Sequence, residues 1–419
     1  MAHGDGCFVI QKNSESKKKM YDAIVVGGRC GGAALAMLLA RKGRRVLIVD
    51  QAQLPSDVRL STHLIWHAGV DRLRQWGLLD TVLASNCPAL TDFSLDMGEL
   101  VLRGRPPGTQ VGATLSPRRL ALDKVLLDAA LQAGAELRQG ITFEDVIQQD
   151  GRVAGIRGRL QDGGAFTAQA KVVVGADGTH SRVARAVGAD TYNEVPKESG
   201  SFNIYSYFSG VALSGVEFFS RPERMFYAWS TNDGRSVVGV IQPGQAPRPA
   251  RQDTEAYFFK ELDTMTPGLA QRVKAGQRDD EWLSGAIATF CRQAAGPGWA
   301  LVGDAGVTMD PVTAAGISSA LRDADLLASL IHQGLASPDG LDAALAGYQT
   351  QRDEVSVPLL QLSQEMGKLA PPTEDVIKLF MALAGNQPQI DRYYGLFAQT
   401  VTPADFFGPA NMAEIFAAA

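Results

Sequence analysis

The stretch IVVGGRCGG, residues 24–32, joins an apolar run to a cluster of glycines and decides the first part of the fold. It closes the apolar segment YDAIVVG (21–27) and opens the small-residue segment GGAALAMLLARKG (31–43), which RRVLIVD (44–50) follows. A strand, a glycine turn, a helix and a second strand within about thirty residues form a βαβ unit. The sequence therefore predicts a parallel sheet whose carboxyl edge binds a ligand.

The glycine turn lacks one glycine of the dinucleotide-binding pattern. In that pattern the first glycine makes the tight turn, the second lets the pyrophosphate approach, and the third packs the helix against the strand. Those positions hold Gly27, Arg29 and Gly32, and a register one residue later holds Gly28, Cys30 and Ala33. Although the middle glycine is missing, the N–H groups that open the helix would still face an anion. We expect a dinucleotide site built from Gly27, Gly28, Arg29, Cys30, Gly31 and Gly32.

Two charged side chains bear on the same site. Asp50 ends the second predicted strand, where an acidic residue hydrogen-bonds a ribose hydroxyl in dinucleotide-binding folds. Arg29 replaces the missing glycine, and its side chain can turn either toward a phosphate or out into solvent. The alternative to a nucleotide site is a doubly wound domain in which these glycines serve only packing.

The composition is that of an ordinary globular protein. The 419 residues are 45% apolar and 20% charged, and a formal charge of -5 gives no reason to expect nucleic acid as a partner. The four cysteines form no CxxC pair, which excludes a disulfide framework, a redox dithiol or a zinc site, and no other metal site is expected. We expect a cytoplasmic protein without a membrane span, two intertwined domains, and a flexible extension over residues 1–19.

The rest of the chain divides into regions of different pattern. Residues 116–134 predict an amphipathic helix capped by Ser116 and Pro117, and KVVVGADG predicts a buried strand that returns to the first sheet. Residues 200–242 are aromatic and rich in β-formers, which predicts a largely antiparallel sheet. A long helix is expected over 316–334, followed by further helices.

Two distant motifs resemble a known family. VVVGADGTHSRVARAVG (172–188) and ALVGDAGVTMDPVTAAGISSAL (300–321), together with the first glycine turn, resemble the three fingerprints of the FAD-dependent aromatic hydroxylase superfamily. That superfamily includes para-hydroxybenzoate hydroxylase-like monooxygenases, geranylgeranyl reductases and flavin-dependent halogenases. The resemblance implies an α/β fold with three parts: a Rossmann-like FAD-binding domain (20–190 and 285–335), an interleaved antiparallel β-sheet substrate domain (191–284) and a helical C-terminal region (336–419).

The resemblance also implies roles for particular residues toward FAD. Asp304 would bind the ribityl chain, and the N–H groups of Gly316 and Ile317 would face the pyrimidine oxygen of the flavin. Asp177 would serve both FAD and the nicotinamide cofactor, and Arg119, assisted by Arg59, would reach the FAD phosphates. Taken singly, each of these charged residues also fits a solvated surface position.

The reaction type is narrowed by what the sequence lacks. No second glycine fingerprint follows the first, which leaves a one-component hydroxylase, a halogenase or a double-bond reductase. The segment MFYAWSTNDGRSVVGV (225–240) keeps the aromatic pair Tyr227 and Trp229 but lacks the apolar-proline ending of halogenases and geranylgeranyl reductases, so both alternatives lose support. In addition, no lysine occurs between Lys42 and Lys124 to carry an activated halogen. Halogenation is therefore disfavoured.

The expected enzyme is an FAD-dependent monooxygenase that uses NAD(P)H and O2. It would hydroxylate or epoxidise a hydrophobic aromatic or polycyclic small molecule through a flavin C4a-hydroperoxide. A flavin-dependent double-bond reductase is the alternative, ahead of a halogenase or a non-catalytic flavin-binding protein. Neither the oligomeric state nor the preference between NADH and NADPH follows from the residues.

Candidate residues for chemistry and for substrate binding remain few. His63 is the candidate catalytic residue because a histidine titrates near neutral pH, although a core histidine beside the flavin is an equal alternative. Strand alternation places Phe202 and Phe208 on the opposite face from Tyr205 and Tyr207. The candidate lining of the substrate pocket is Tyr205, Tyr207, Tyr227 and Trp229, and ordinary sheet packing explains these side chains equally well.

Overall fold

The first sheet is built around the predicted βαβ unit. The computed structural model describes residues 20–58, 60–337 and 340–417, so the predicted extension 1–19 lies outside the described residues. β1 (Tyr21–Val26), α1 (Cys30–Arg41) and β2 (Val46–Asp50) follow one another, and the two strands pair in parallel from Ala23↔Val46. The prediction of a parallel sheet at this point is confirmed.

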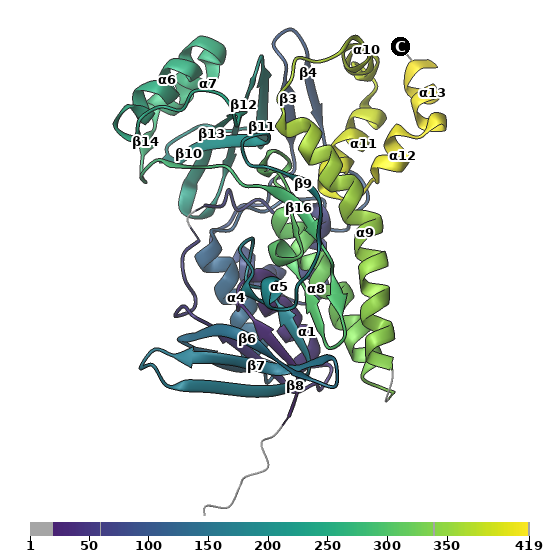
Figure 1. Cartoon of the computed structure of the whole chain (residues 1–419). Helices are drawn as coiled ribbons and strands as arrows, with labels where there is room; N and C mark the ends of the chain where they lie inside the picture. The colour runs from purple at the N-terminus through teal and green to yellow at the C-terminus, as the bar shows by residue number, and fades with distance from the viewer. Residues whose placement is uncertain (1–19, 59, 338–339, 418–419) are drawn as a thin grey trace, which may run out of the picture.

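Segments far apart in the sequence complete this sheet. Its strand order is β17-β18-β8-β1-β2-β5, in which β8 (Ala165–Gly175) and β18 (Trp299–Leu301) are parallel to β1. The predicted return of the KVVVGADG strand is therefore confirmed. The helices α1, α4 (Arg119–Gln132) and α8 (Gly316–Gly334) supply much of the core beside the sheet. The antiparallel strands β6 (Ile141–Gln149) and β7 (Arg152–Leu160) extend β8 at the bottom of Figure 1.

The helix expected over 116–134 begins later than predicted. α4 starts at Arg119, and Arg118 stands at the position before it without a capping side chain. Ser116 cannot cap the helix because its hydroxyl donates to the carbonyl of Thr62 (3.2 Å) and accepts from the indole of Trp229 (3.2 Å). Contacts with distant segments thus override the local capping signal.

The second sheet is mainly antiparallel and has two apolar faces. Its order is β14-β10-β13-β12-β11-β3-β4, with β10 (Ser201–Ser209), β13 (Arg235–Pro243), β12 (Arg224–Ser230) and β11 (Val216–Arg221). β3 (Phe93–Asp96) pairs in parallel with β11, and β4 (Val101–Gly104) is antiparallel to β3. Strands from before residue 105 thus complete the sheet that the aromatic segment 200–242 begins.

The alternation predicted for the aromatic strands is confirmed. Tyr205, Tyr207, Tyr227 and Trp229 pack into one apolar cluster, whereas Phe202, Phe208 and Phe226 belong to another on the opposite face. The helices α6 (Thr254–Met265) and α7 (Pro267–Ala275) cover that opposite face. The cluster with the tyrosines is instead closed by residues of the C-terminal helices.

The C-terminal region is helical, as expected. α9 (Gly340–Gly367) runs along one side of the molecule past both sheets, and α10 (Glu374–Leu383), α11 (Gln387–Ala398), α12 (Pro403–Phe407) and α13 (Pro409–Ala417) gather beside the second sheet (Figure 1). A third sheet, β19 (Val307–Thr308), β16 (Thr289–Arg292) and β9 (Thr191–Val195), lies close to α9.

Among the described residues no helix has the length and apolar character needed to cross a membrane. The remaining elements are α2 (His67–Gln75), α3 (Leu79–Leu83), α5 (Arg182–Ala186), β5 (Glu136–Gln139), β14 (Gln277–Arg278), β15 (Leu283–Gly285) and β17 (Ala295–Gly296).

Candidate functional site

One cavity collects most of the residues that the sequence motifs single out. It has a volume of about 610 Å³ and lies at the carboxyl ends of β1, β2 and β8. Gly28 and Gly32 do not line it, and Arg59 lies outside the described residues. The predicted residues on its wall are Gly27, Arg29, Cys30, Gly31, Asp50, His63, Arg119, Asp177, Asp304, Gly316 and Ile317. We call this space the cofactor cavity.

The backbone of the glycine turn explains which positions must be glycine. Gly27 has φ +106°, and a Cβ there would lie 2.3 Å from the carbonyl oxygen of Ala176. A Cβ on Gly32 would lie only 1.9 Å from the carbonyl oxygen of Gly27, so the helix could not pack against the turn. Arg29 instead has extended backbone (φ −92°, ψ −169°), which any residue can adopt. The missing middle glycine is therefore no stereochemical defect.

Two helices begin at the cofactor cavity without a capping side chain. α1 follows Arg29 and α8 follows Ala315, and neither residue caps its helix through a side-chain hydrogen bond. The first residues of both helices line the cavity. Because the first N–H groups of a helix carry partial positive charge, two such ends favour a ligand with negative charge at two places.

Arg29 and Asp50 are held in place beside the turn. The guanidinium of Arg29 donates from Nη2 to the hydroxyl of Ser56 (2.9 Å), while its buried Nε has no hydrogen-bond partner among residues 20–58, 60–337 and 340–417. The carboxylate of Asp50 accepts from the N–H groups of Gly28 (2.9 Å) and Ala52 (2.8 Å). Arg29 is thus part of the cavity wall, and Asp50 keeps acceptor capacity there for a hydroxyl.

A buried ion pair forms part of the wall. Arg119 pairs with Asp123 one helical turn later (3.0 Å), and both side chains are almost completely buried. Asp304 opens onto the cavity but is otherwise surrounded by protein, which raises the pKa of its carboxyl against the opposing effect of Arg119. Burial also raises the pKa of the Cys30 thiol to about 11, so this residue is a neutral thiol at pH 7.

The carboxylate of Asp177 is engaged by its own loop. It accepts from the hydroxyl of Ser181 (2.6 Å) and from the N–H groups of Arg182 (2.7 Å) and Val183 (3.2 Å), which open α5. These bonds shape the turn that contacts Gly27. In this structure Asp177 therefore builds the cavity wall by fixing a loop.

His63 is buried and neutral at the edge of the cavity. Its Nε2 lies 2.6 Å from the hydroxyl of Tyr207, and that hydroxyl donates to the carbonyl of Ser61 (2.9 Å). We assign the proton to Nε2 on this network, which leaves the buried Nδ1 as an acceptor that has no partner within the part of the chain that the structure describes. Burial, reinforced by the charges of Arg119 and Arg118, lowers the pKa of His63 to about 3.

The four predicted substrate-pocket residues do not line the cofactor cavity. Tyr205, Tyr207, Tyr227 and Trp229 are all buried, and the Tyr227 hydroxyl donates to Asn203 (2.9 Å) while the Trp229 indole donates to the carbonyl of Thr62 (3.1 Å). Their polar groups find partners in the protein, so these side chains pack the sheet.

A small apolar cavity opens on the same face of the sheet. Its volume is about 30 Å³, and we call it the aromatic cavity. It is lined by Trp66, Leu95, Phe218, Met225, Val312, Thr313, Met366, Tyr393, Tyr394 and Phe397. These residues come from seven separate segments of the chain, so no sequence motif groups them, and only the aromatic run YYGLF near the C-terminus could have signalled them.

One short segment separates the two cavities. Pro311, Ala314 and Ala315 line the cofactor cavity, whereas Val312 and Thr313 line the aromatic cavity. The indole of Trp66 donates to the carbonyl of Thr313 (2.9 Å) and holds this segment in place. We call residues 311–315 the partition.

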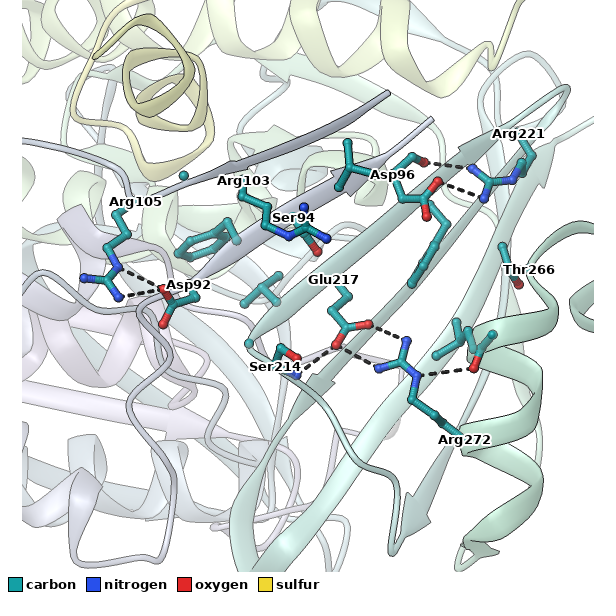
Figure 2. Close-up of a pocket in the computed structure, with 18 of the residues that line it drawn as sticks. Asp92, Ser94, Asp96, Arg103, Arg105, Ser214, Glu217, Arg221, Thr266 and Arg272 are labelled. Carbon is teal, nitrogen blue, oxygen red and sulfur yellow. Dashed lines mark hydrogen bonds and ion pairs between the residues drawn. The ribbon is translucent and has the colours of Figure 1, made fainter. Parts of the chain in front are cut away.

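A larger groove lies elsewhere, on the outer face of the second sheet. Figure 2 shows its charged side chains, and its volume is about 870 Å³. No residue that the sequence predicts for the site lines it among the described positions. Its charges largely neutralise one another in the pairs Arg105–Asp92, Arg221–Asp96 and Arg272–Glu217. The volume of a cavity therefore does not identify the site. The N-termini of α1 and α8 indicate the cofactor cavity instead.

Comparison with known proteins supports this assignment. Residues 20–363 match the family described as FAD binding domain. The chain is 26% identical over 355 residues to a digeranylgeranylglycerophospholipid reductase of Methanocella arvoryzae, covering 80% of this chain and 83% of the reductase.

Two solved structures share the fold over almost the whole chain. The flavin-dependent brominase Bmp2 has a TM-score of 0.78 at 19% identity and covers 96% of this chain and 98% of its own. The p-nitrophenol 4-monooxygenase PnpA of Pseudomonas putida has a TM-score of 0.75 at 18% identity and covers 91% and 98%. The resemblance inferred from the three motifs is confirmed.

Proposed function

Because this chain belongs to the FAD binding domain family of flavin-dependent oxidoreductases, we propose that it is a monooxygenase that uses NAD(P)H and O2. Its substrate would be a hydrophobic aromatic or polycyclic small molecule, which it hydroxylates or epoxidises. The alternative is a flavin-dependent double-bond reductase. The observation that carries the proposal is the partition, which divides a polar cavity from an aromatic one.

The residues of the cofactor cavity fit FAD. The open end of α1 and the guanidinium of Arg29 suit a pyrophosphate, and Asp50 suits a ribose hydroxyl. The open end of α8, with Gly316 and Ile317, suits the negative charge of a reduced flavin ring. Bound FAD would accept a hydride from NAD(P)H and, once reduced, would supply electrons for the reaction with O2.

The aromatic cavity supports the proposed class of substrate. Its lining is apolar except for a few polar atoms, and among the described residues the hydroxyl of Tyr393 makes no hydrogen bond, whereas that of Tyr394 donates to the carbonyl of Leu102 (3.0 Å). An apolar molecule with one hydrogen-bonding group matches this arrangement. Since small-molecule sites are usually about 300 Å³ or more, side chains such as Met366 and Phe397 must move to admit it.

His63 can accept a hydrogen bond from a ligand at the edge of the cofactor cavity. Its ring is neutral, its Nε2–H is held by Tyr207, and among the described residues its Nδ1 has no hydrogen-bond partner. A hydroxyl or a water molecule at the cavity edge can donate to Nδ1. Because the pKa of His63 is low, the ring accepts a hydrogen bond at pH 7 without becoming a cation.

The reductase alternative has an observation of its own. The curated relative that covers four-fifths of this chain is named a reductase, and its identity exceeds that of the compared monooxygenase and brominase structures. Halogenation has less support because the segment between Lys42 and Lys124 contains no lysine. Both alternatives use the same cofactor cavity.

The deciding experiment measures the mass of the product. The purified protein is first tested for bound FAD and is then supplied with NAD(P)H and a panel of phenols, polycyclic aromatics and isoprenoid alkenes. Oxygen-dependent formation of a product heavier by one oxygen atom supports the monooxygenase. Anaerobic saturation of an alkene overturns it in favour of the reductase, and a protein that fails to take up FAD overturns both.

A further inference from the structure

We propose that Arg292 is a positioning residue that holds two loops of the cofactor cavity together without touching the cofactor. This inference rests on the FAD site proposed above. One loop, residues 176–180, carries Asp177, and the other, residues 303–306, carries Asp304. The two loops follow the paired strands β8 and β18, which meet at Gly175 and Leu301, and a bond between the loops would fix their spacing beyond the strand ends.

The guanidinium of Arg292 supplies that bridge. It donates from Nη1 to the carbonyl of Ala305 (2.9 Å) and from Nη2 to the carbonyl of Thr179 (3.0 Å). It also lies over the ring of Phe290, with 4.1 Å between Cζ and the ring centroid. Arg292 itself does not line the cofactor cavity. Because a guanidinium is a rigid planar fork, these two bonds set the separation of the two carbonyls.

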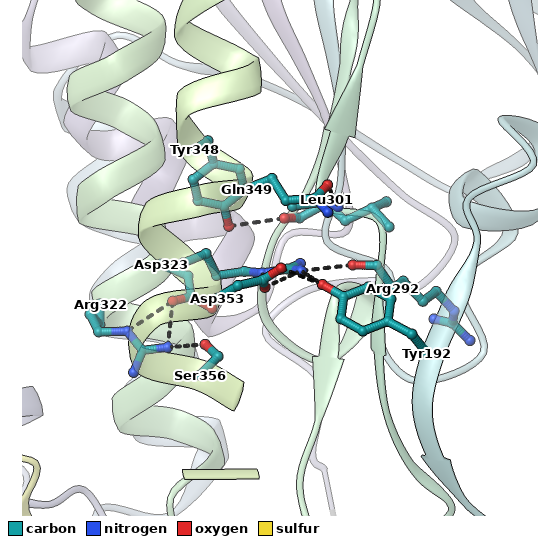
Figure 3. A network of polar contacts seen from close by, with 11 residues as sticks. Tyr192, Arg292, Leu301, Arg322, Asp323, Tyr348, Gln349, Asp353 and Ser356 are labelled. Carbon is teal, nitrogen blue, oxygen red and sulfur yellow. Dashed lines mark hydrogen bonds and ion pairs between the residues drawn. The ribbon is translucent and has the colours of Figure 1, made fainter. Parts of the chain in front are cut away.

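The backbone of Arg292 is fixed from the opposite side. Its N–H donates to the carbonyl of Gly306 (2.7 Å), and its own carbonyl accepts from Nη2 of Arg352 (2.8 Å). Arg352 comes from α9, is only 1% exposed, and is itself held by Asp353 (2.7 Å) and by the hydroxyl of Tyr192 (2.8 Å). Figure 3 shows this network with the carbonyl of Arg292 turned toward it and the guanidinium turned away.

The arrangement links the C-terminal region to the cofactor. α9 anchors β16 through Arg352, and β16 ends in Arg292, which anchors both loops. If Arg292 only stabilised the fold, removing its guanidinium would lower the stability of the free and of the FAD-bound protein equally. A positioning role predicts that the loops relax apart and that FAD affinity falls more than stability does.

The test compares Arg292→Lys with a matched arginine outside the site. Arg221 also donates to backbone carbonyls, those of Met265 (2.9 Å), Asp96 (2.9 Å) and its neighbour Ser220 (2.8 Å), but it lines the groove on the second sheet. Lysine keeps the charge but cannot span two carbonyls as a fork. Full-length wild type, Arg292→Lys and Arg221→Lys are loaded with FAD and diluted, and the return of flavin fluorescence gives the rate and extent of release.

We expect Arg292→Lys to bind FAD about tenfold or more weakly, the effect of losing a charge-assisted hydrogen bond, with an altered flavin circular dichroism spectrum. Arg221→Lys should keep the wild-type affinity while losing similar thermal stability. Wild-type affinity and spectrum in Arg292→Lys overturn the inference. If the wild type itself takes up no FAD, the proposed function fails instead, and the two failures are thereby distinguished.

Discussion

The imidazole of His63 lies 2.6 Å from the hydroxyl of Tyr207, and this pair joins the cofactor cavity to the aromatic sheet. His63 lines the cavity, whereas Tyr207 belongs to the apolar cluster of the second sheet. The rings are stacked with centroids 5.6 Å apart. His63, predicted for catalysis, is thus held by a hydrogen bond to Tyr207, predicted for the substrate pocket.

The first prediction concerns pH. Burial and two arginines lower the pKa of His63 from 6.5 to about 3, so below pH 6.5 the unfolded chain takes up a proton that the folded chain refuses. Stability should fall as pH drops from 6.5 toward 3, by up to about 1.4 kcal/mol per pH unit from this residue. His63→Asn, which suits the positive φ at this position (65°), should flatten the pH dependence measured by chemical unfolding.

A second buried histidine, His67, contributes to the same pH dependence. Burial lowers the pKa of His67 to about 4, so it contributes a decline over the same range. His63→Asn should therefore keep a weaker slope rather than none. An unchanged slope in His63→Asn would show that the ring of His63 is not protected from protonation in the folded state.

The second prediction concerns the turn glycines. Gly32→Ala places a methyl group 1.9 Å from the carbonyl oxygen of Gly27, so backbone must shift and the protein should lose about 2 kcal/mol or more of stability. Gly31→Ala is the matched control, because a methyl group there meets Ala320 at an ordinary 3.7 Å. Thermal unfolding of FAD-free protein separates the two variants, and equal melting temperatures would contradict the packing argument.

The third prediction concerns the residue in place of the middle glycine. Arg29→Gly should leave the fold intact but weaken FAD binding by about 1 to 2 kcal/mol, because a guanidinium on the cavity wall is lost. Arg29→Lys should recover part of the affinity and increase its salt dependence. Tighter binding by Arg29→Gly, measured by fluorescence titration, would show instead that the side chain obstructs the pyrophosphate.

The fourth prediction concerns Asp304. The residue opens onto the cofactor cavity, and Asp304→Ala removes an acceptor for the ribityl hydroxyls, so the purified variant should retain less FAD. Asp325→Ala is the control, since that carboxylate is partly exposed and makes a long ion pair with Arg72 (3.8 Å). Equal flavin-to-protein absorbance ratios in the two variants would mean that the second motif is misplaced.

The sequence by itself predicted the parts of this protein that depend on short-range spacing. The βαβ unit follows from an apolar run, a glycine turn and a second apolar run, and α8 begins at Gly316 as its pattern predicted. The division of Tyr205 and Tyr207 from Phe202 and Phe208 follows from the two-residue period of a strand. These features depend on neighbours within one element, which the sequence displays directly.

Only the tertiary structure decided how the walls of the site are made. The start of α4, the lining of the aromatic cavity and the fork of Arg292 each depend on partners more than a hundred residues away. The sequence predicts Ser116 as a helix cap, but the indole of Trp229 bonds its hydroxyl instead. No sequence motif includes Arg292, whose guanidinium bonds two loop carbonyls. Such contacts arise from the packing of whole elements, and no local pattern of residues encodes them.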